Sequence, residues 1–132
     1  MKFQNKIIAD TSVWIDFFRS RHNEYVEILI EQLKHKNILM CGMIELEIRQ
    51  GLRVHERAIT DDFLKTIEFI DSTREDYQIA GDLISEMKSR GITESAQDSL
   101  IAAVCINNNI QLLTTDLDFH HFPKLKIVEI KK

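Results

Sequence analysis

Two kinds of segment alternate along this chain: short apolar runs, and longer stretches whose apolar residues recur at helical spacing. The short runs are bounded by polar and turn-forming residues, which predicts strands buried on both faces at residues 6–9, 38–41, 110–113 and 126–130. The helical spacing predicts helices over residues 13–18, 25–35, 42–51, 56–69, 77–90 and 95–106. A further short strand is expected near residues 68–71.

The order of these segments predicts the fold class. Parallel strands need crossover helices between them, and strands that are apolar throughout need cover on each face. We therefore expect an α/β protein, a three-layer α/β/α sandwich around a parallel sheet. The 132 residues, 44% of them apolar, suffice to bury one core, so we expect a single domain over residues 1–132.

The chain shows no sign of a membrane segment or of secretion. No apolar run approaches the roughly 20 residues that a membrane span needs, and the first ten residues lack the features of a signal peptide. Cys41 and Cys105 stand in apolar surroundings without a CxxC or Cys/His spacing, so we interpret them as reduced core residues. A cytoplasmic protein with no membrane partner is expected.

The charge of the chain decides little about nucleic acid. A formal net charge of −4 argues against a binder of the basic-patch kind. If several carboxylates gather round a divalent metal ion, however, their charge is largely neutralised there, and the remaining charges are close to balanced. Composition is therefore neutral on nucleic-acid binding.

Four acidic residues stand where the chemistry of an open parallel sheet is expected. In such sheets, functional groups gather beyond the carboxyl ends of the strands, where the strand order reverses. Asp10 directly follows the first strand, and Asp116 follows the strand at 110–113. Asp98 begins the helix before that strand, and Glu47 lies in the helix after the second strand. We expect these four side chains to converge at one end of the sheet.

A cluster of carboxylates predicts a cation. Two like charges about 4 Å apart repel by roughly 4 kcal/mol at an effective dielectric near 20. An all-oxygen set suits hard divalent cations, which favours Mg²⁺ or Mn²⁺ over Zn²⁺. Such an ion can lower the pKa of bound water and neutralise charge on an attacked phosphodiester. The pattern therefore indicates phosphodiester hydrolysis.

Each acid, taken alone, also has a structural explanation. Asp10 could simply cap the helix that follows it, and Ser95 with Asp98 has the spacing of a capping box. Asp116 and Asp118 could be turn residues that accept backbone hydrogen bonds. The functional hypothesis rests on the combination of acids.

Glu45 competes with Glu47 for the place in the second helix. The two glutamates flank the apolar stripe of that helix on opposite sides, so periodicity does not choose between them. Gly51 favours Glu47, because it lies one turn later on nearly the same line and leaves room for another element to approach.

Basic residues near the acids have weaker signals. Adjacent His120 and His121 are expected to face solvent, since an oxygen-rich metal site does not need them. Three arginines are candidate phosphate contacts, without a pattern that separates them from ordinary surface charges: Arg19, Arg21 and Arg49.

Four segments of the chain together resemble the PIN domain of the VapC toxin type. They read, in order, IIADTSVWIDFF, ELEIRQGL, DSLIAAVC and LLTTDLDFHHF, and they extend over nearly the whole chain. The resemblance implies a five-stranded parallel sheet with helices on both sides. It also implies a Mg²⁺- or Mn²⁺-dependent endoribonuclease that belongs to a toxin–antitoxin pair.

The resemblance assigns roles to seven residues of this chain. The four catalytic and metal-binding acids of the family correspond to Asp10, Glu47, Asp98 and Asp116, with Glu47 rather than Glu45 in the Glu-Ile-x-x-Gly pattern. Asp118 matches a further acid of the metal site, and Ser12 and Thr114 match supporting hydroxyl positions. Three of the acids would position the metal, Glu47 would help to orient the nucleophile, and cleavage would leave a 5′-phosphate and a 3′-hydroxyl.

A binding role is the alternative to catalysis. Toxins of this type pair with a VapB-type antitoxin, so the complex would reach DNA only through the antitoxin and repress its own operon. Trp14, Phe17 and Phe18 could serve the antitoxin or a homodimer, although core packing is the simpler explanation. A haloacid-dehalogenase-type phosphatase is disfavoured because Ser12 stands where a second aspartate is needed, and a receiver domain because Lys126 begins the last strand instead of ending it.

Overall fold

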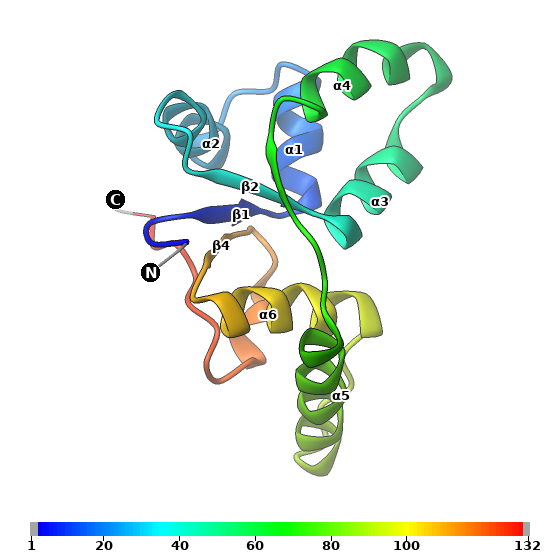
Figure 1. The fold of residues 1–132 in the computed structure, drawn as a ribbon, viewed down its shortest axis with the longest axis vertical. Helices are drawn as coiled ribbons and strands as arrows, with labels where there is room; N and C mark the ends of the chain where they lie inside the picture. The colour runs from blue at the N-terminus through cyan, green and yellow to red at the C-terminus, as the bar shows by residue number, and fades with distance from the viewer. Residues whose placement is uncertain (1–2, 131–132) are drawn as a thin grey trace.

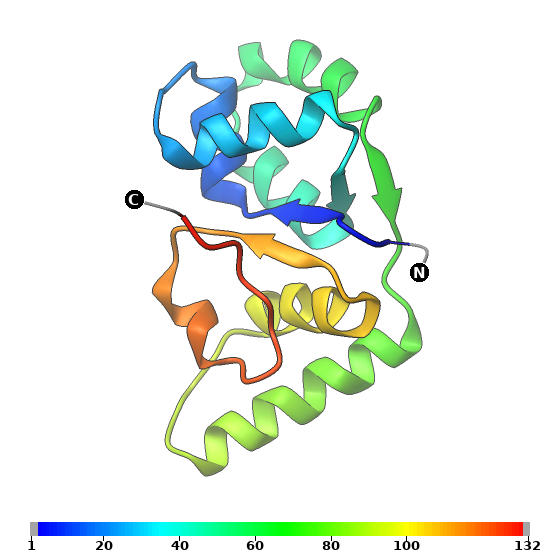
Figure 2. The same ribbon diagram turned by 90° about the vertical axis from the view of Figure 1, so that its left-hand side faces the viewer.

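A computed structural model describes residues 3–130 and places a parallel sheet at the centre of the molecule (Figures 1 and 2). The strands are β1 (Ile7–Ala9), β2 (Ile38–Cys41), β3 (Glu68–Ile70) and β4 (Gln111–Leu113), in the spatial order β3-β2-β1-β4. Every residue of β1 and β2 is buried. This agrees with their continuous apolar sequence, because the central strands of a covered sheet have no solvent face.

Helices cover both faces of this sheet, as the sequence predicts. Figure 2 shows α1 (Thr11–Phe18), α2 (Glu24–Lys34) and α4 (Arg57–Leu64) on one side, and α5 (Arg74–Ser89) and α6 (Ala96–Asn108) on the other. The helix α3 (Gly42–Gly51) begins where β2 ends and contacts both α1 and α6. The α/β class with a parallel sheet between helical layers is confirmed.

The predicted fifth strand at residues 126–130 is wrong. This segment makes an isolated parallel bridge, in which Leu112 N donates to Lys126 O and Val128 N donates to Leu112 O, both at 2.9 Å. The reason is the shortness of β4. Backbone groups of a strand point alternately to its two neighbours, so in a three-residue strand that pairs with β1, only Leu112 presents its N–H and C=O outward.

The predicted helix over residues 56–69 is too long. A short 3₁₀ turn (Val54–Glu56) precedes α4, which ends at Leu64, and β3 follows as a separate strand close to its predicted place. The Thr66 hydroxyl donates to the carbonyl of Phe63 at 2.7 Å, which satisfies an acceptor at the end of the helix. The remaining helices begin and end within a few residues of their predicted bounds.

Aromatic and cysteine side chains belong to the core. Trp14 is fully buried and packs against Phe17, Phe18 and Phe63 with ring centroids 5.7 to 6.3 Å apart, so core packing is confirmed for Trp14, while Phe17 and Phe18 are half-buried against the core. Both cysteines are buried and free. None of the helices formed by residues 3–130 is long and apolar enough to cross a membrane.

Candidate active site

The strand order reverses beside β1. The chain proceeds from β1 to β2 and β3 on one side, and β4 then pairs with the other edge of β1. The carboxyl ends of β1 and β4 therefore meet at the switch point, where open α/β sheets bind their ligands. Asp10 follows β1 directly, and Asp116 lies three residues beyond the end of β4.

The structure brings the four predicted acids to a pocket at this point. The pocket has a volume of about 570 Å³ and is lined by three hydroxyl residues and four acids, namely Thr11, Ser12, Thr115, Asp10, Glu47, Asp98 and Asp116. The acids come from the end of β1, from α3, from the first turn of α6 and from the turn after β4. Residues that are distant in the chain thus share one concave surface.

Asp10 is held by two hydrogen bonds. Its Oδ1 accepts from the backbone N–H of Thr11 at 2.8 Å, and its Oδ2 accepts from the Thr114 hydroxyl at 2.6 Å. Burial raises the pKa of Asp10, the two hydrogen bonds lower it in part, and the charge of Asp116 raises it further. Asp10 is therefore both the cap of α1 and a member of the acid cluster.

Thr11 holds Glu47 in the pocket. The Thr11 hydroxyl donates to Oε1 of Glu47 at 2.8 Å, across the contact between α1 and α3. Glu45 instead accepts from Arg49 at 3.2 Å, so the structure distinguishes two glutamates that periodicity leaves equivalent. Gly51 lies against Ile15, where an added Cβ would sit 3.6 Å from the Ile15 side chain.

Asp98 experiences the charge of the whole cluster. Its backbone N–H donates to the Ser95 hydroxyl at 3.0 Å. The pKa of Asp98 is raised to about 6, first by burial and then by Asp10, Asp116, Glu47 and Glu94, in that order. Neighbouring negative charges disfavour ionisation of one carboxyl group, and this is expected in a carboxylate cluster that binds a cation.

The segment after β4 places Asp116 through a turn. The backbone N–H of Asp116 donates to the Thr114 hydroxyl at 3.0 Å, and Oδ1 of Asp116 accepts from the backbone N–H of Asp118 at 2.9 Å. Asp118 is exposed and is not among the residues that line the pocket. Ser12 does line it, with its hydroxyl oxygen 3.4 Å from that of Thr115.

The donor set suits a hydrated hard cation. Within residues 3–130, no three His, Cys, Asp or Glu side chains lie close enough together to hold a metal ion directly. The four carboxylates nevertheless share one pocket, where burial and the other three acids raise the pKa of Asp98. Because Mg²⁺ usually keeps several of its waters and binds proteins through a few carboxylates, oxygen donors around an open pocket fit it.

The three arginines that are candidate phosphate contacts form ion pairs with acids that do not line the pocket. Each candidate phosphate contact pairs with an acid: Arg19 with Glu56, Arg21 with Asp16, and Arg49 with Glu45 and Asp61. His120 and His121 are both exposed, as predicted.

His121 has a partner that the sequence did not indicate. Its Nδ1 lies 2.8 Å from Oε1 of Glu94, which is nearly buried. Glu94 is also one of the acids that raise the pKa of Asp98.

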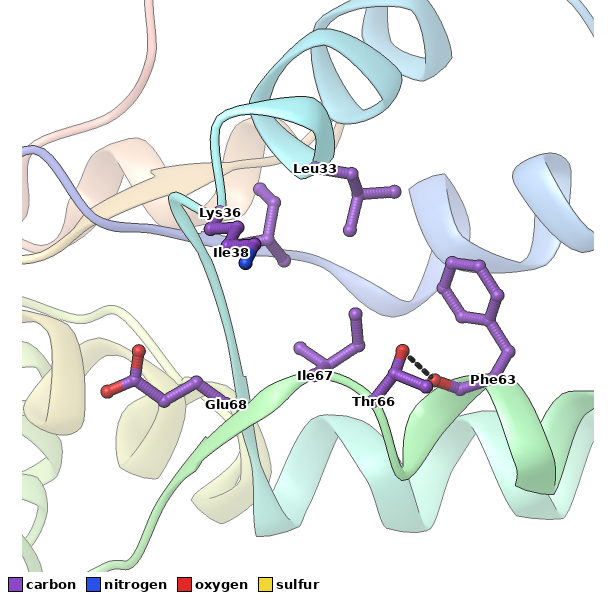
Figure 3. Close-up of a pocket in the computed structure, with 7 residues that line it drawn as sticks. All are labelled: Leu33, Lys36, Ile38, Phe63, Thr66, Ile67 and Glu68. Carbon is purple, nitrogen blue, oxygen red and sulfur yellow. Dashed lines mark hydrogen bonds between the residues drawn. The ribbon is translucent and has the colours of Figure 1, made fainter.

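Another cavity, of about 430 Å³, lies at the opposite end of the sheet (Figure 3). Ile38 and Glu68, at the starts of β2 and β3, line it together with Leu33 and Phe63 from the covering helices. It contains a single acid, Glu68, whose exposed carboxylate lies 3.6 Å from the amine of Lys6. This cavity therefore lacks the clustered carboxylates that make the pocket with the four acids a candidate active site.

The fold and the pocket define an α/β protein with a carboxylate cluster at the switch point of its sheet. The family model of the PIN domain matches residues 7–125, and the chain belongs to this family. No protein with a curated description matches the chain in sequence.

Several solved structures share the fold. One is VapBC2 from Rickettsia felis, bound to a DNA fragment from its promoter. It matches with a TM-score of 0.80 at 21% identity, and the match covers 95% of this chain and 98% of the matched chain. DNA-bound VapBC from Salmonella typhimurium matches with a TM-score of 0.80 at 17% identity, over 93% and 96%. FitAcB from Neisseria gonorrhoeae matches with a TM-score of 0.76 at 19% identity, over 92% and 96%.

Proposed function

We propose that this protein is a Mg²⁺- or Mn²⁺-dependent endoribonuclease and the toxin of a VapBC-type toxin–antitoxin pair. The convergence of Asp10, Glu47, Asp98 and Asp116 on one pocket carries the proposal. PIN domains are generally nucleases, which agrees with this donor set. When bound, a divalent ion would supply positive charge for the attacked phosphodiester and for the departing oxygen.

The residues of the pocket would have different roles in the reaction. Asp10, Asp98 and Asp116 would hold the ion, directly or through water. Glu47 would orient the attacking water, whose addition at phosphorus breaks the bond to the 3′-oxygen and leaves a 3′-hydroxyl and a 5′-phosphate. The hydroxyl of Thr114 keeps the buried carboxylate of Asp10 in place, as the hydroxyl of Thr11 does for Glu47.

Replacement of Asp98 by Asn tests the nuclease. Asp98→Asn keeps the shape of the side chain and the Ser95 cap of α6, but removes the charge. Cleavage of single-stranded RNA with Mg²⁺ should fall by more than about 100-fold, because even the outer partner of a metal ligand is worth 10- to 100-fold. The matched control is Asp82→Asn on the exposed face of α5, which should cleave like the unmodified protein. Undiminished cleavage by folded Asp98→Asn would contradict the proposal.

We further propose a VapB-type antitoxin as the partner, with homodimerisation of the toxin and contact to DNA only through the antitoxin. The fold similarity to DNA-bound VapBC complexes supports the antitoxin as the partner. It also supports the alternative that the chain acts mainly as a regulatory partner in such a complex. Expression of the chain without its antitoxin distinguishes the two, since growth arrest that disappears with Asp98→Asn requires the nuclease.

A further inference from the structure

We propose that a cavity beside the carboxylate pocket binds one unpaired nucleobase of the RNA strand. We name it the C-terminal cavity; its volume is about 600 Å³, and Tyr25, Thr115, Leu117, His120 and Ile130 are among its lining residues. The inference rests on the proposed RNA substrate and adds a recognition site to it.

The last segment of the chain, residues 125 and 127–130, contributes much of the lining of the cavity. Val128 N donates to Leu112 O, and among the described residues no backbone bond joins residues 129–130 to β4 beyond this point. The last segment and the turn after β4 both line the cavity, the former through Ile130 and the latter through Thr115.

The cavity adjoins the carboxylate pocket. Thr115 lines both hollows, and its hydroxyl oxygen lies 3.4 Å from that of Ser12 in the pocket. Thr114 lines the cavity and donates to Asp10. An RNA strand whose phosphate lies at the acids would therefore have a neighbouring nucleoside within reach of the cavity.

The lining suits a neutral aromatic ligand. Tyr25 contributes a half-buried ring, His120 an exposed one, and Leu117 an apolar side chain that is 77% exposed. The lining includes the acid Glu129, which disfavours a phosphate group. Proteins that recognise single-stranded RNA stack its bases on aromatic side chains, and the volume lies within the usual range for ligand sites, about 300–1,000 Å³.

Free nucleosides test the cavity separately from the nuclease. Adenosine, cytidine, guanosine and uridine carry no phosphate, so they need no metal and are not cleaved. Each would be titrated into the metal-free protein while the amide signals of Thr115, Leu117 and Ile130 are followed by NMR. At least one nucleoside should shift these signals saturably, and inorganic phosphate should not displace it.

Variants identify the ring that contacts the base. Tyr25→Leu should weaken nucleoside binding roughly tenfold, as expected for loss of one base–aromatic stack. Tyr77→Leu is the matched control, because Tyr77 is 58% exposed on α5 and does not line the cavity. If Tyr25→Leu fails to fold, His120→Ala at an exposed position should weaken binding in the same direction.

The outcomes separate this inference from the proposed function. RNA cleavage by the unmodified protein, with equal nucleoside affinity in Tyr25→Leu, His120→Ala and Tyr77→Leu, overturns the base site alone. Nucleoside binding at the cavity without RNA cleavage overturns the nuclease alone. Absence of any saturable shift overturns the base site. So does a shift of these signals only by a peptide of the antitoxin, which would make the cavity a protein-docking site.

Discussion

At the level of single residues, hydroxyl groups position the carboxylates of the candidate site. Thr11 donates to Glu47, and Thr114 donates to Asp10 while accepting from the backbone of Asp116. One threonine thus joins the two acids that follow β1 and β4. The acids are partly oriented before any cation arrives, which reduces the reorganisation that binding requires.

Replacement of Thr11 tests this positioning. Thr11→Val keeps the branched shape but removes the donor to Glu47, so RNA cleavage should fall by about 10- to 100-fold. Thr11→Ser restores a hydroxyl and should recover most of the activity. The measurement is the rate of cleavage at saturating RNA, with Mg²⁺ affinity determined in parallel. Equal rates for the Val and Ser variants would show that the bond has no role.

The raised pKa of Asp98 predicts a pH dependence of stability. In the metal-free protein its pKa is about 6, against 3.8 for an ordinary aspartate, so the folded state binds more protons between these values. The contribution to stability is complete below pH 3.8 and is lost as the pH rises through about 6.

Asp98→Asn removes this pH dependence. In EDTA at pH 7 the variant should melt at a higher temperature than the unmodified protein, because it lacks one charge among four carboxylates. Near pH 4 the difference should shrink or vanish. Thermal melts in EDTA across this range provide the measurement, and a lower melting temperature for the variant at pH 7 would contradict the explanation.

At the level of elements, the N-termini of two helices position acids of the candidate site. Asp10 caps α1 at the end of β1, and Ser95 caps α6 through its hydroxyl, which accepts from the N–H of Asp98. At the other end of α6 the C-cap is Asn109, at a φ of 54°, a left-handed conformation that Asn tolerates better than most residues. Asp98 lies in the first turn of α6, so the cap at Ser95 fixes its position.

Replacement of the α6 cap tests this element. Ser95→Ala should lower the free energy of unfolding by about 1 kcal/mol, because a backbone donor of the first turn loses its partner. Ser95→Asn retains a capping oxygen and should stay close to the unmodified protein. Urea unfolding measures both. Equal stability of the Ala and Asn variants would show that the cap contributes nothing.

At the level of the whole molecule, the helical layers cover the central strands β1 and β2, which are buried throughout. Cys41 ends β2 and Cys105 lies in α6, and both thiols are buried. Burial raises the pKa of Cys41 to about 11 and that of Cys105 well above its usual value. Both are therefore unreactive in the folded state, because the thiolate is the reactive form.

Thiol labelling tests whether this cover is intact. The native protein at pH 8 should react slowly with an aromatic disulfide reagent, and both thiols should react at once in concentrated urea. The absorbance of the released thiolate reports the number of modified cysteines. Rapid native labelling of either cysteine would show that the core opens readily at that position.

Local sequence patterns predict the helical layers and, together with the family resemblance, the four acids. Continuous apolar runs require cover on two faces, and an acid directly after such a run must lie at the carboxyl end of a strand. Asp10 could be placed in this way because it directly follows β1, whereas Asp116 lies three residues beyond β4, in the turn that follows that strand. The family pattern selected Glu47 over Glu45, and the fold places Glu47 in the pocket.

The contacts that join separate elements could not be predicted from the sequence and depend on the three-dimensional fold. The bond from Thr11 to Glu47, the pairing of Arg19 with Glu56 and the bridge between His121 and Glu94 have no local signature. Residues 126–130 have a strand-like sequence, yet they form only an isolated bridge, because β4 offers them one residue to pair with. Hydrophobic patterns in the sequence predict which residues are buried, whereas hydrogen-bond partners depend on which elements meet in space.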